Sequence, residues 1–132
     1  VEQAGQAAQT DEPGERPAGY RARAAKVGPL IGARALGGTV YDLDPGESIC
    51  PYHYEWGNEE WLVVLEGKPT VRDEDDWEEE LKPWDVVVFV EGPEGAHKVT
   101  NKSKEPVRVM MIWKGRTEMT WIRETTTMMM TT

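Results

Sequence analysis

The chain is organised around CPYHYEWGNEEWLVVLEG, residues Cys50–Gly67, in which an alternating polar segment passes through an acidic turn into an apolar run. Successive side chains of a β-strand point to opposite faces, so His53 and Glu55 share one face of the first strand. Glu59 and Glu60 open the next strand and bring a carboxylate back beside this pair. Side chains that can bind a metal ion thus converge from neighbouring strands, which is how a β-barrel builds a metal site.

The composition is that of a single acidic domain. The 132 residues are enough for one hydrophobic core, and 15 Lys and Arg against 24 Asp and Glu give a net charge of −9. Seven of the acids lie in Asp73–Glu80, so the rest of the chain sums to −2, which is −9 plus 7. Binding to a nucleic-acid backbone needs basic patches, which the sequence does not contain, so we expect no nucleic-acid partner. The acidic run instead predicts an exposed strand edge that repels edge-to-edge pairing.

The sequence indicates a cytoplasmic protein without a membrane segment. Its first residues, VEQAGQAAQTDEPG, contain no apolar core of a signal peptide, and no apolar run approaches the length of a membrane span. Cys50 is the only cysteine, which excludes an internal disulfide and fits a reducing compartment. Because Cys50 is three residues before His53, alternation places it on the opposite face as a buried free thiol.

Short apolar or alternating runs separated by turn signals predict eight or nine strands and no amphipathic helix. The expected strands are Thr39–Leu43, Ile49–Glu55, Trp61–Leu65, Thr70–Arg72, Trp77–Leu81, Asp85–Val90, His97–Thr100, Pro106–Trp113 and Met119–Ile122. Asp85–Val90 reads DVVVFV, a continuous apolar run typical of a strand buried on both faces. The expected core side chains are Leu62, Val64, Val86, Val88, Val90, Val107, Val109 and Met111. This regular spacing of short strands predicts an all-β antiparallel sandwich or barrel.

Three segments of the chain differ in composition. Residues 1–28 are rich in Ala, Gln, Gly and Pro and predict a flexible or surface-draped N-terminal arm, with a short helix near Tyr20–Lys26. Residues 29–123 contain the predicted strands and form the barrel. Residues 124–132 end in TTTMMMTT, which is a low-complexity tail unless these letters are placeholders for a poorly defined end.

The residues around His53 resemble the first motif of the cupin superfamily, whose members fold as a double-stranded β-helix, or jelly-roll barrel. That motif has a glycine, a His-x-His pair, a glutamate after four more residues and a glycine after six more. Gly46, His53, Glu60 and Gly67 match it, with one residue more than usual before His53. Glu55 occupies the position of the second histidine, which is the main departure from the pattern.

The second cupin motif has a glycine, a Pro-x-Gly, a histidine, and an asparagine four positions after that histidine. Gly92, His97 and Asn101 match it, with a loop between Gly92 and His97 that is two residues longer than the simplest pattern. Trp84 stands at the first glycine and Val90 at the proline. We expect Asn101 to cap a turn rather than to bind a metal ion.

The resemblance covers residues 36–113 and implies one divalent metal ion, whose ligands would be His53, Glu55, Glu60 and His97. The chain contains two histidines, and both fall on these ligand positions. Two nitrogen and two oxygen donors favour iron(II), manganese(II) or zinc over copper(I). If Glu55 turns away, the other three still form a two-His-one-carboxylate set. Glu59 is an alternative to Glu60, although the spacing to Gly67 favours Glu60, and the carboxylate at position 55 could also abolish metal binding.

The same resemblance implies small-molecule chemistry. The aromatic side chains expected to line a substrate pocket beside the metal ion are Tyr52, Tyr54 and Trp56. Glu55 is the candidate catalytic residue, as a fourth ligand or as a proton shuttle. The implied function is a metal-dependent enzyme of oxygenase or isomerase type; the alternative is a non-catalytic ligand-binding or storage cupin with a degenerate metal site. Small cupins commonly pair sheet to sheet, so we expect a homodimer with Trp61 and Val107–Trp113 at its interface.

Overall fold

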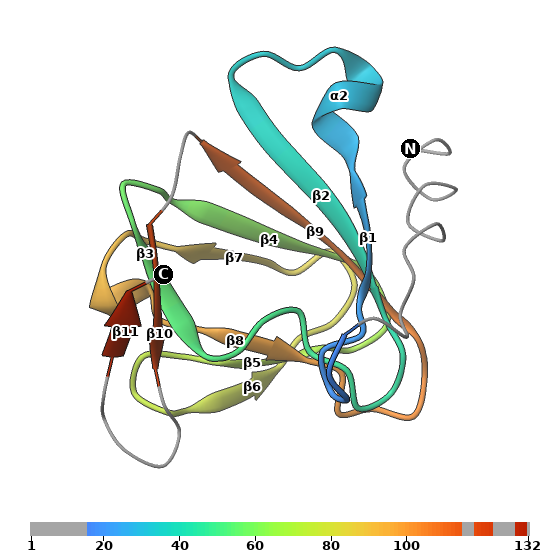
Figure 1. The fold of residues 1–132 in the computed structure, drawn as a ribbon. Helices are drawn as coiled ribbons and strands as arrows, with labels where there is room; N and C mark the ends of the chain where they lie inside the picture. The colour runs from blue at the N-terminus through green and yellow to red at the C-terminus, as the bar shows by residue number, and fades with distance from the viewer. Residues whose placement is uncertain (1–15, 115–117, 123–128, 132) are drawn as a thin grey trace.

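Antiparallel strands make up nearly all of the regular structure (Figure 1). The computed structural model describes residues 16–114, 118–122 and 129–131. Residues 1–15 of the predicted arm, and residues 124–128 and 132 of the predicted tail, lie outside this part of the chain. The described helices are the short α2 (Val27–Ile31) and the 3-10 turn η2 (Pro93–Gly95), and neither has the length and apolar character that crossing a bilayer requires.

Five strands form the larger sheet, in the order β1-β2-β9-β4-β7. They are β1 (Arg23–Lys26), β2 (Leu36–Leu43), β9 (Val107–Lys114), β4 (Glu60–Glu66) and β7 (Val86–Phe89). All neighbours are antiparallel, and the β4–β9 register shifts at a bulge between Val64 and Glu66. Because strands that are distant in sequence are neighbours here, this sheet ties the early, middle and late parts of the chain together.

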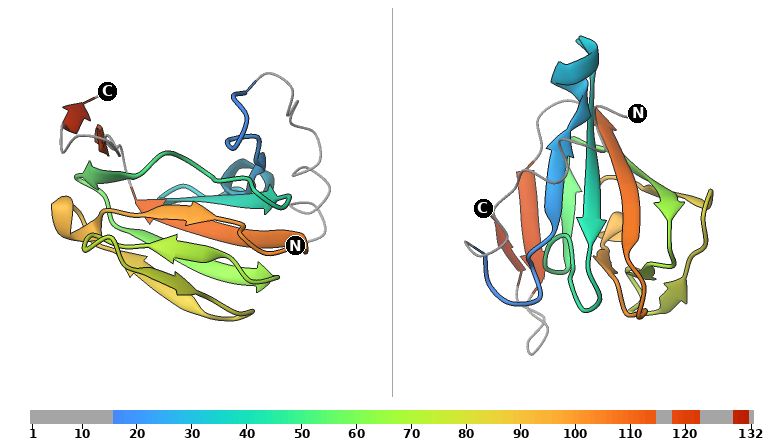
Figure 2. Two further views of the ribbon diagram at one scale, coloured as in Figure 1. Left: turned by 90° about the horizontal axis from the view of Figure 1, so that it is seen from below. Right: turned by 90° about the vertical axis from the view of Figure 1, so that its right-hand side faces the viewer.

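Two three-stranded sheets complete the barrel, one in the order β11-β10-β3 and the other in the order β6-β5-β8. Their strands are β3 (His53–Trp56), β5 (Thr70–Arg72), β6 (Glu78–Glu80), β8 (Lys98–Thr100), β10 (Glu118–Ile122) and β11 (Met129–Thr131). An isolated antiparallel bridge between His53 and His97 joins β3 to the residue before β8. In Figure 2, β10 and β11 lie at one end of the molecule beside β3. The architecture is the all-β jelly roll that the sequence predicts.

The core lies between the sheets and follows the alternation of the strands. On β4, Leu62 and Val64 are fully buried while Trp61 is half exposed, as the sequence predicts. On β9, Val107, Val109 and Met111 meet them from the neighbouring strand. The inward-facing residues of β4 and β9 are therefore apolar, except where β4 begins with the carboxylate of Glu60.

The strand predicted at Asp85–Val90 forms as β7, but the prediction that it is buried on both faces is wrong. Val86, Val88 and Val90 are 57%, 51% and 41% exposed and do not belong to the core, whereas Phe89 is buried. Among the described strands β7 pairs with β4 alone, at the edge of the sheet. A continuous apolar run does not reveal that one of its two faces is left uncovered, so the sequence alone could not distinguish this strand from a central one.

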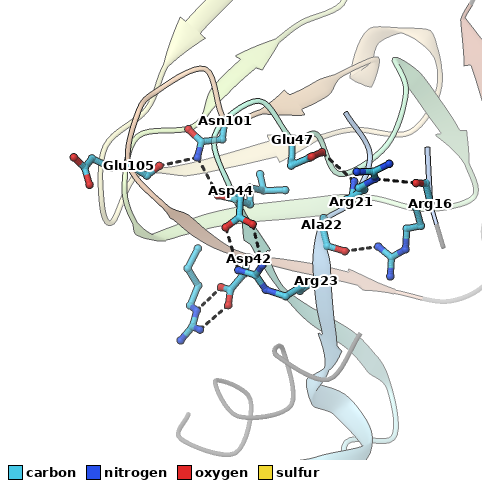
Figure 3. Close-up of polar contacts among 11 residues, drawn as sticks. Arg16, Arg21, Ala22, Arg23, Asp42, Asp44, Glu47, Asn101 and Glu105 are labelled. Carbon is cyan, nitrogen blue, oxygen red and sulfur yellow. Dashed lines mark hydrogen bonds and ion pairs between the residues drawn. The ribbon is translucent and has the colours of Figure 1, made fainter. Parts of the chain in front are cut away.

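The predicted helix near Tyr20–Lys26 is a strand instead. Its last four residues form β1, which extends the larger sheet beside β2. The Arg23 guanidinium donates to the Asp44 carboxylate at 3.0 and 3.3 Å, at the end of the β1–β2 pair where Arg23 lies opposite Asp42 (Figure 3). Ala22 and Ala25 are buried, so tertiary packing overrides the high helix propensity of alanine. Residues 23–26 of the predicted arm are thus part of the barrel wall.

Asn101 caps the turn after β8, as predicted. Its Nδ2 donates to the backbone oxygens of Leu43 and Glu105 at 2.9 and 2.7 Å (Figure 3). Its Oδ1 accepts from the backbone N–H of Ser103 at 3.0 Å. A fully buried amide that is used on backbone groups in this way stabilises the turn and is not a metal ligand.

Trp84 keeps the backbone conformation of the glycine that the cupin pattern has at its position. Its φ is 72°, in the left-handed region, where a residue with a Cβ atom is strained by about 1–2 kcal/mol. Its side chain is 75% exposed, so burial within the chain does not offset the strain.

Replacing Trp84 with glycine is therefore expected to raise the free energy of unfolding by about 1 kcal/mol, because glycine adopts this conformation without strain. Urea unfolding of the dilute protein measures the change. Trp77→Gly is the matched control, since Trp77 is equally open to solvent but does not have a positive φ, and its replacement should give no gain. An unfolding free energy that is unchanged or lower in Trp84→Gly would contradict the strain.

Candidate metal centre

The structure brings together the four side chains that the cupin pattern implies as ligands. His53 and Glu55 lie on one face of β3, Glu60 opens β4, and His97 precedes β8. One nitrogen or carboxylate oxygen from each lies within 4.8 Å of the others. Glu59 is not in this cluster: it is exposed and accepts a hydrogen bond from Trp61 Nε1 at 3.2 Å.

Backbone pairing places the two imidazoles side by side. The N–H of His53 donates to the carbonyl of His97 at 3.2 Å, and the N–H of His97 donates to that of His53 at 2.9 Å. Their ring centroids are 4.6 Å apart. Two residues separated by 43 others in the chain thus become direct neighbours through a short antiparallel bridge.

Backbone carbonyls fix the tautomer of both rings. The carbonyl of Pro51 lies 2.9 Å from His53 Nδ1, and that of Gly95 lies 2.7 Å from His97 Nδ1. A carbonyl oxygen only accepts, so each Nδ1 carries the hydrogen and each Nε2 keeps its lone pair. Both lone pairs face the carboxylates: His53 Nε2 is 3.5 Å from Glu55 Oε2, and His97 Nε2 is 3.4 Å from Glu60 Oε1. Histidines that bind metal ions in proteins are commonly oriented in this way, by a hydrogen bond from the ring nitrogen that does not bind the metal.

Burial shifts the titration of two members of the cluster, Glu60 and His97, away from charge. It raises the pKa of Glu60, and the neighbouring Glu55 carboxylate raises that pKa further. It lowers the pKa of His97 to about 3, with a further contribution from His53. Glu60 Oε1 has no hydrogen-bond partner among the described residues. An unpartnered buried oxygen among further acceptors fits a bound cation, so the residues present are suited to a divalent metal ion.

Residues 39–113, more than half of the chain, match the family described as the Cupin domain. The chain belongs to the cupin family. No curated protein matches this cupin in sequence. All four candidate ligand residues lie within the matched range.

Solved structures of other cupin-like proteins resemble this cupin. A protein from Acidithiobacillus ferrooxidans, provisionally named a sugar phosphate isomerase, is 25% identical with a TM-score of 0.70, over 77% of this chain and 64% of that one. A sugar phosphate isomerase of the cupin superfamily from Silicibacter pomeroyi is 21% identical with a TM-score of 0.72, over 86% and 75%. The polyketide cyclase RemF from Streptomyces resistomycificus is 21% identical with a TM-score of 0.65, over 77% and 70%. This cupin thus spans less than two thirds of the first protein, and its likeness to the other two supports the fold alone.

The aromatic residues predicted to line a substrate pocket lie around β3. Tyr52 and Tyr54 are buried in a cluster with Ala96, which Ile122 adjoins. Trp56 is about half exposed and meets the ring of Tyr54 edge-on, with centroids 5.9 Å apart. The strand alternation turns Tyr54 away from His53 and Glu55, and the pocket role of these residues stays a prediction.

Cys50 lies before the first residue of β3, so the strand alternation that predicted its face does not apply to it. It is a half-buried free thiol rather than a fully buried one. Burial, followed by the charges of Glu60 and Glu55, raises its pKa to about 11. The thiol therefore lies within electrostatic reach of the cluster and stays protonated at neutral pH.

Three neighbours of the cluster were not predicted. Phe89 stacks on His97 with ring centroids 3.6 Å apart and planes within 6°, and Trp121 lies 5.2 Å from His53. Asn58 donates to Glu55 from the turn between β3 and β4. Phe89 stands opposite Glu60 in the register of β4 and β7, a pairing that the sequence alone does not reveal. Nothing in the sequence motifs indicates the other two.

The pKa of Glu60 gives a pH-dependent stability to the metal-free protein. Folded Glu60 holds its proton at pH values where the unfolded chain is ionised, so stability falls as pH rises above the ordinary carboxylate pKa. His97 acts in the opposite direction and only below about pH 6.5, where the unfolded chain gains a proton that the folded protein does not.

Glu60→Gln should therefore make the chelator-treated protein more stable than wild type at about pH 8, by on the order of 1 kcal/mol or more. Thermal unfolding between about pH 7 and pH 9 measures this effect, and the wild-type slope should flatten in the variant. Glu59→Gln removes an exposed carboxylate outside the cluster and should follow wild type. Parallel pH profiles for wild type and Glu60→Gln would show that Glu60 is ionised when folded.

Proposed function

We propose that this cupin is a metal-dependent enzyme that acts on a small organic molecule. The observation that carries the proposal is the convergence of two imidazole Nε2 atoms and two carboxylates in one buried cluster. Two nitrogen and two oxygen donors fit iron(II), manganese(II) or zinc. The residues that would hold the ion are His53, Glu55, Glu60 and His97.

A divalent ion, when bound, polarises a carbonyl or carboxylate oxygen or activates water or dioxygen. The protein supplies orientation and proton transfer. Phe89 and Trp121 pack against the two imidazoles, hold the rings in place and limit the access of water. Glu55 is the candidate general acid and base, because a carboxylate at the cluster can take a proton from a bound molecule and return it to another atom.

Isomerase-type chemistry has more support than oxygenase chemistry. The structural neighbour from Acidithiobacillus ferrooxidans, which is 25% identical, is provisionally named a sugar phosphate isomerase. Moving a proton between carbon atoms beside a polarised carbonyl needs one carboxylate and a Lewis acid, and the cluster has residues for both. The proposed substrate is therefore a small molecule with a carbonyl group, bound at the cluster.

Protein purified without chelator or affinity nickel should contain close to one transition-metal ion per chain. His53→Ala and His97→Ala each remove a nitrogen ligand and should lower the metal content at least about tenfold, as measured by elemental analysis. Glu59→Gln, outside the cluster, should keep the metal. Proton exchange of small hydroxycarbonyl compounds in deuterated water, followed by NMR, then tests for catalysis.

Wild-type protein that contains no metal would refute the site. So would metal that is retained when His53→Ala and His97→Ala are combined in one variant. The former result would favour the alternative function, a non-catalytic ligand-binding or storage cupin. Metal without turnover of any carbonyl compound would place the protein among metal-containing binding proteins.

We also propose that two copies pair through the outer face of the five-stranded sheet. Trp61 lies beside Val88 and Ile112 in the register, and Val63 lies beside Val86. A cavity of about 610 Å³ opens next to Trp61 on this side, with apolar walls that include Leu36, Val90, Ile112 and Trp113. An exposed apolar face of this kind is unusual on a monomer, and a second copy offers the same face, so a two-fold pairing covers both.

Light scattering during size-exclusion chromatography should therefore give twice the chain mass of 14.9 kDa. Trp61→Glu places a charge in the centre of the apolar face and should yield the single-chain mass. Trp77→Glu changes a tryptophan that is even more exposed, within the acidic run Asp73–Glu80, and should leave the dimer intact. A monomeric wild type, or a Trp61→Glu dimer, would contradict this interface.

A further inference from the structure

Asn58 connects the candidate metal ligand Glu55 to the end of β9 in the larger sheet, next to the residue that pairs with Glu60. It lies in the turn between β3 and β4, yet it is 5% exposed, whereas its neighbours Gly57 and Glu59 are exposed. Its Nδ2 donates to Glu55 Oε1 at 3.3 Å. Its Oδ1 accepts from the backbone N–H of Lys114, the last residue of β9, at 3.0 Å.

The second contact fixes which way the Asn58 amide faces. A backbone N–H can only donate, so the atom that meets Lys114 must be the amide oxygen. The NH₂ group must then face Glu55, where it needs an acceptor. The turn is thus built for an oxygen at position 55. An imidazole bound to a metal ion through one nitrogen presents an N–H on the other, which could not accept this bond.

The two oxygens of Glu55 therefore have different surroundings. Oε1 is held by Asn58, whereas Oε2 faces the cluster, 3.5 Å from His53 Nε2. A carboxylate that is held by one oxygen offers a metal ion its other oxygen in a defined direction. Without that bond, the carboxylate could rotate and bind the ion through both oxygens or leave it.

We propose that Asn58 is a positioning residue that makes Glu55 a one-oxygen ligand and so leaves a coordination position open for a substrate. This inference rests on the proposed metal-dependent function of the site. It also gives the departure at position 55 a role, since Glu55 comes with a dedicated hydrogen-bond donor in the same turn.

Cobalt(II) is a suitable probe, because its visible spectrum reports the number and arrangement of its ligands. Chelator-treated wild type, Asn58→Ala, Glu55→Ala and the double variant are titrated with cobalt(II), and thermal unfolding of each metal-free protein checks its fold. Asn58→Ala should weaken cobalt(II) binding about tenfold or more and change the spectrum. In the Glu55→Ala background the same substitution should have no further effect, because the residue that it positions is gone.

Asn58→Asp covers the case in which Asn58→Ala does not fold. Its carboxylate still accepts from the Lys114 N–H, which keeps the turn, but it no longer donates to Glu55. Its cobalt(II) spectrum should therefore differ from that of wild type. Glu59→Gln, in the same turn but outside the cluster, should match wild type in affinity and spectrum.

The outcomes separate this inference from the proposed function. Wild-type protein that binds no cobalt(II) refutes the metal centre itself. Wild-type binding with unchanged affinity and spectrum in both Asn58 variants refutes only the role of Asn58. An equal loss of affinity on Asn58→Ala in the presence and absence of Glu55 shows that Asn58 acts on the site by a route other than Glu55, which also overturns the inference.

Discussion

Four hydrogen-bond acceptors share one buried volume in this protein, and much of the surrounding structure depends on that constraint. Two imidazole lone pairs and two carboxylates cannot satisfy one another without protons or a cation. The backbone carbonyls of Pro51 and Gly95 enforce the conflict, because they hold a hydrogen on the far side of each ring. A carboxyl group that keeps its proton, as Glu60 does, relieves the conflict in part, and a divalent ion would relieve it fully.

The jelly roll supplies the rigidity that such an arrangement needs. The histidines are locked by a backbone bridge and by aromatic neighbours, and Glu60 begins a strand whose next inward residues, Leu62 and Val64, are fully buried. The polar cluster therefore adjoins the apolar core, since Glu60, Leu62 and Val64 follow one another on the inward face of β4. Side chains that break the local rule of an apolar core, on strands that are otherwise regular, are the usual mark of a functional site.

The fold class and the convergence of the four cluster residues could be predicted from the sequence, because both depend on strand alternation and on motif spacing. Features that depend on which strands are neighbours in a sheet could not be predicted from the sequence. The apolar run Val86–Val90 gave no sign that it occupies a sheet edge, and the alanines near β1 favour a helix until they are paired with β2. Asn58 had no recognisable pattern, since its role comes from a contact with Lys114, which is 56 residues away.

The bridge between His53 and His97 also protects the sheet against mispairing. Shifting β3 by one residue would turn Tyr54 toward the position of the cluster and carry both His53 and Glu55 to the opposite face of the strand. The chemistry of the centre and the alignment of the strands are therefore a single property of this protein. An insertion in β3 that moved the strand by one place would therefore erase the centre, even though His53, Glu55, Glu60 and His97 all remained in the chain.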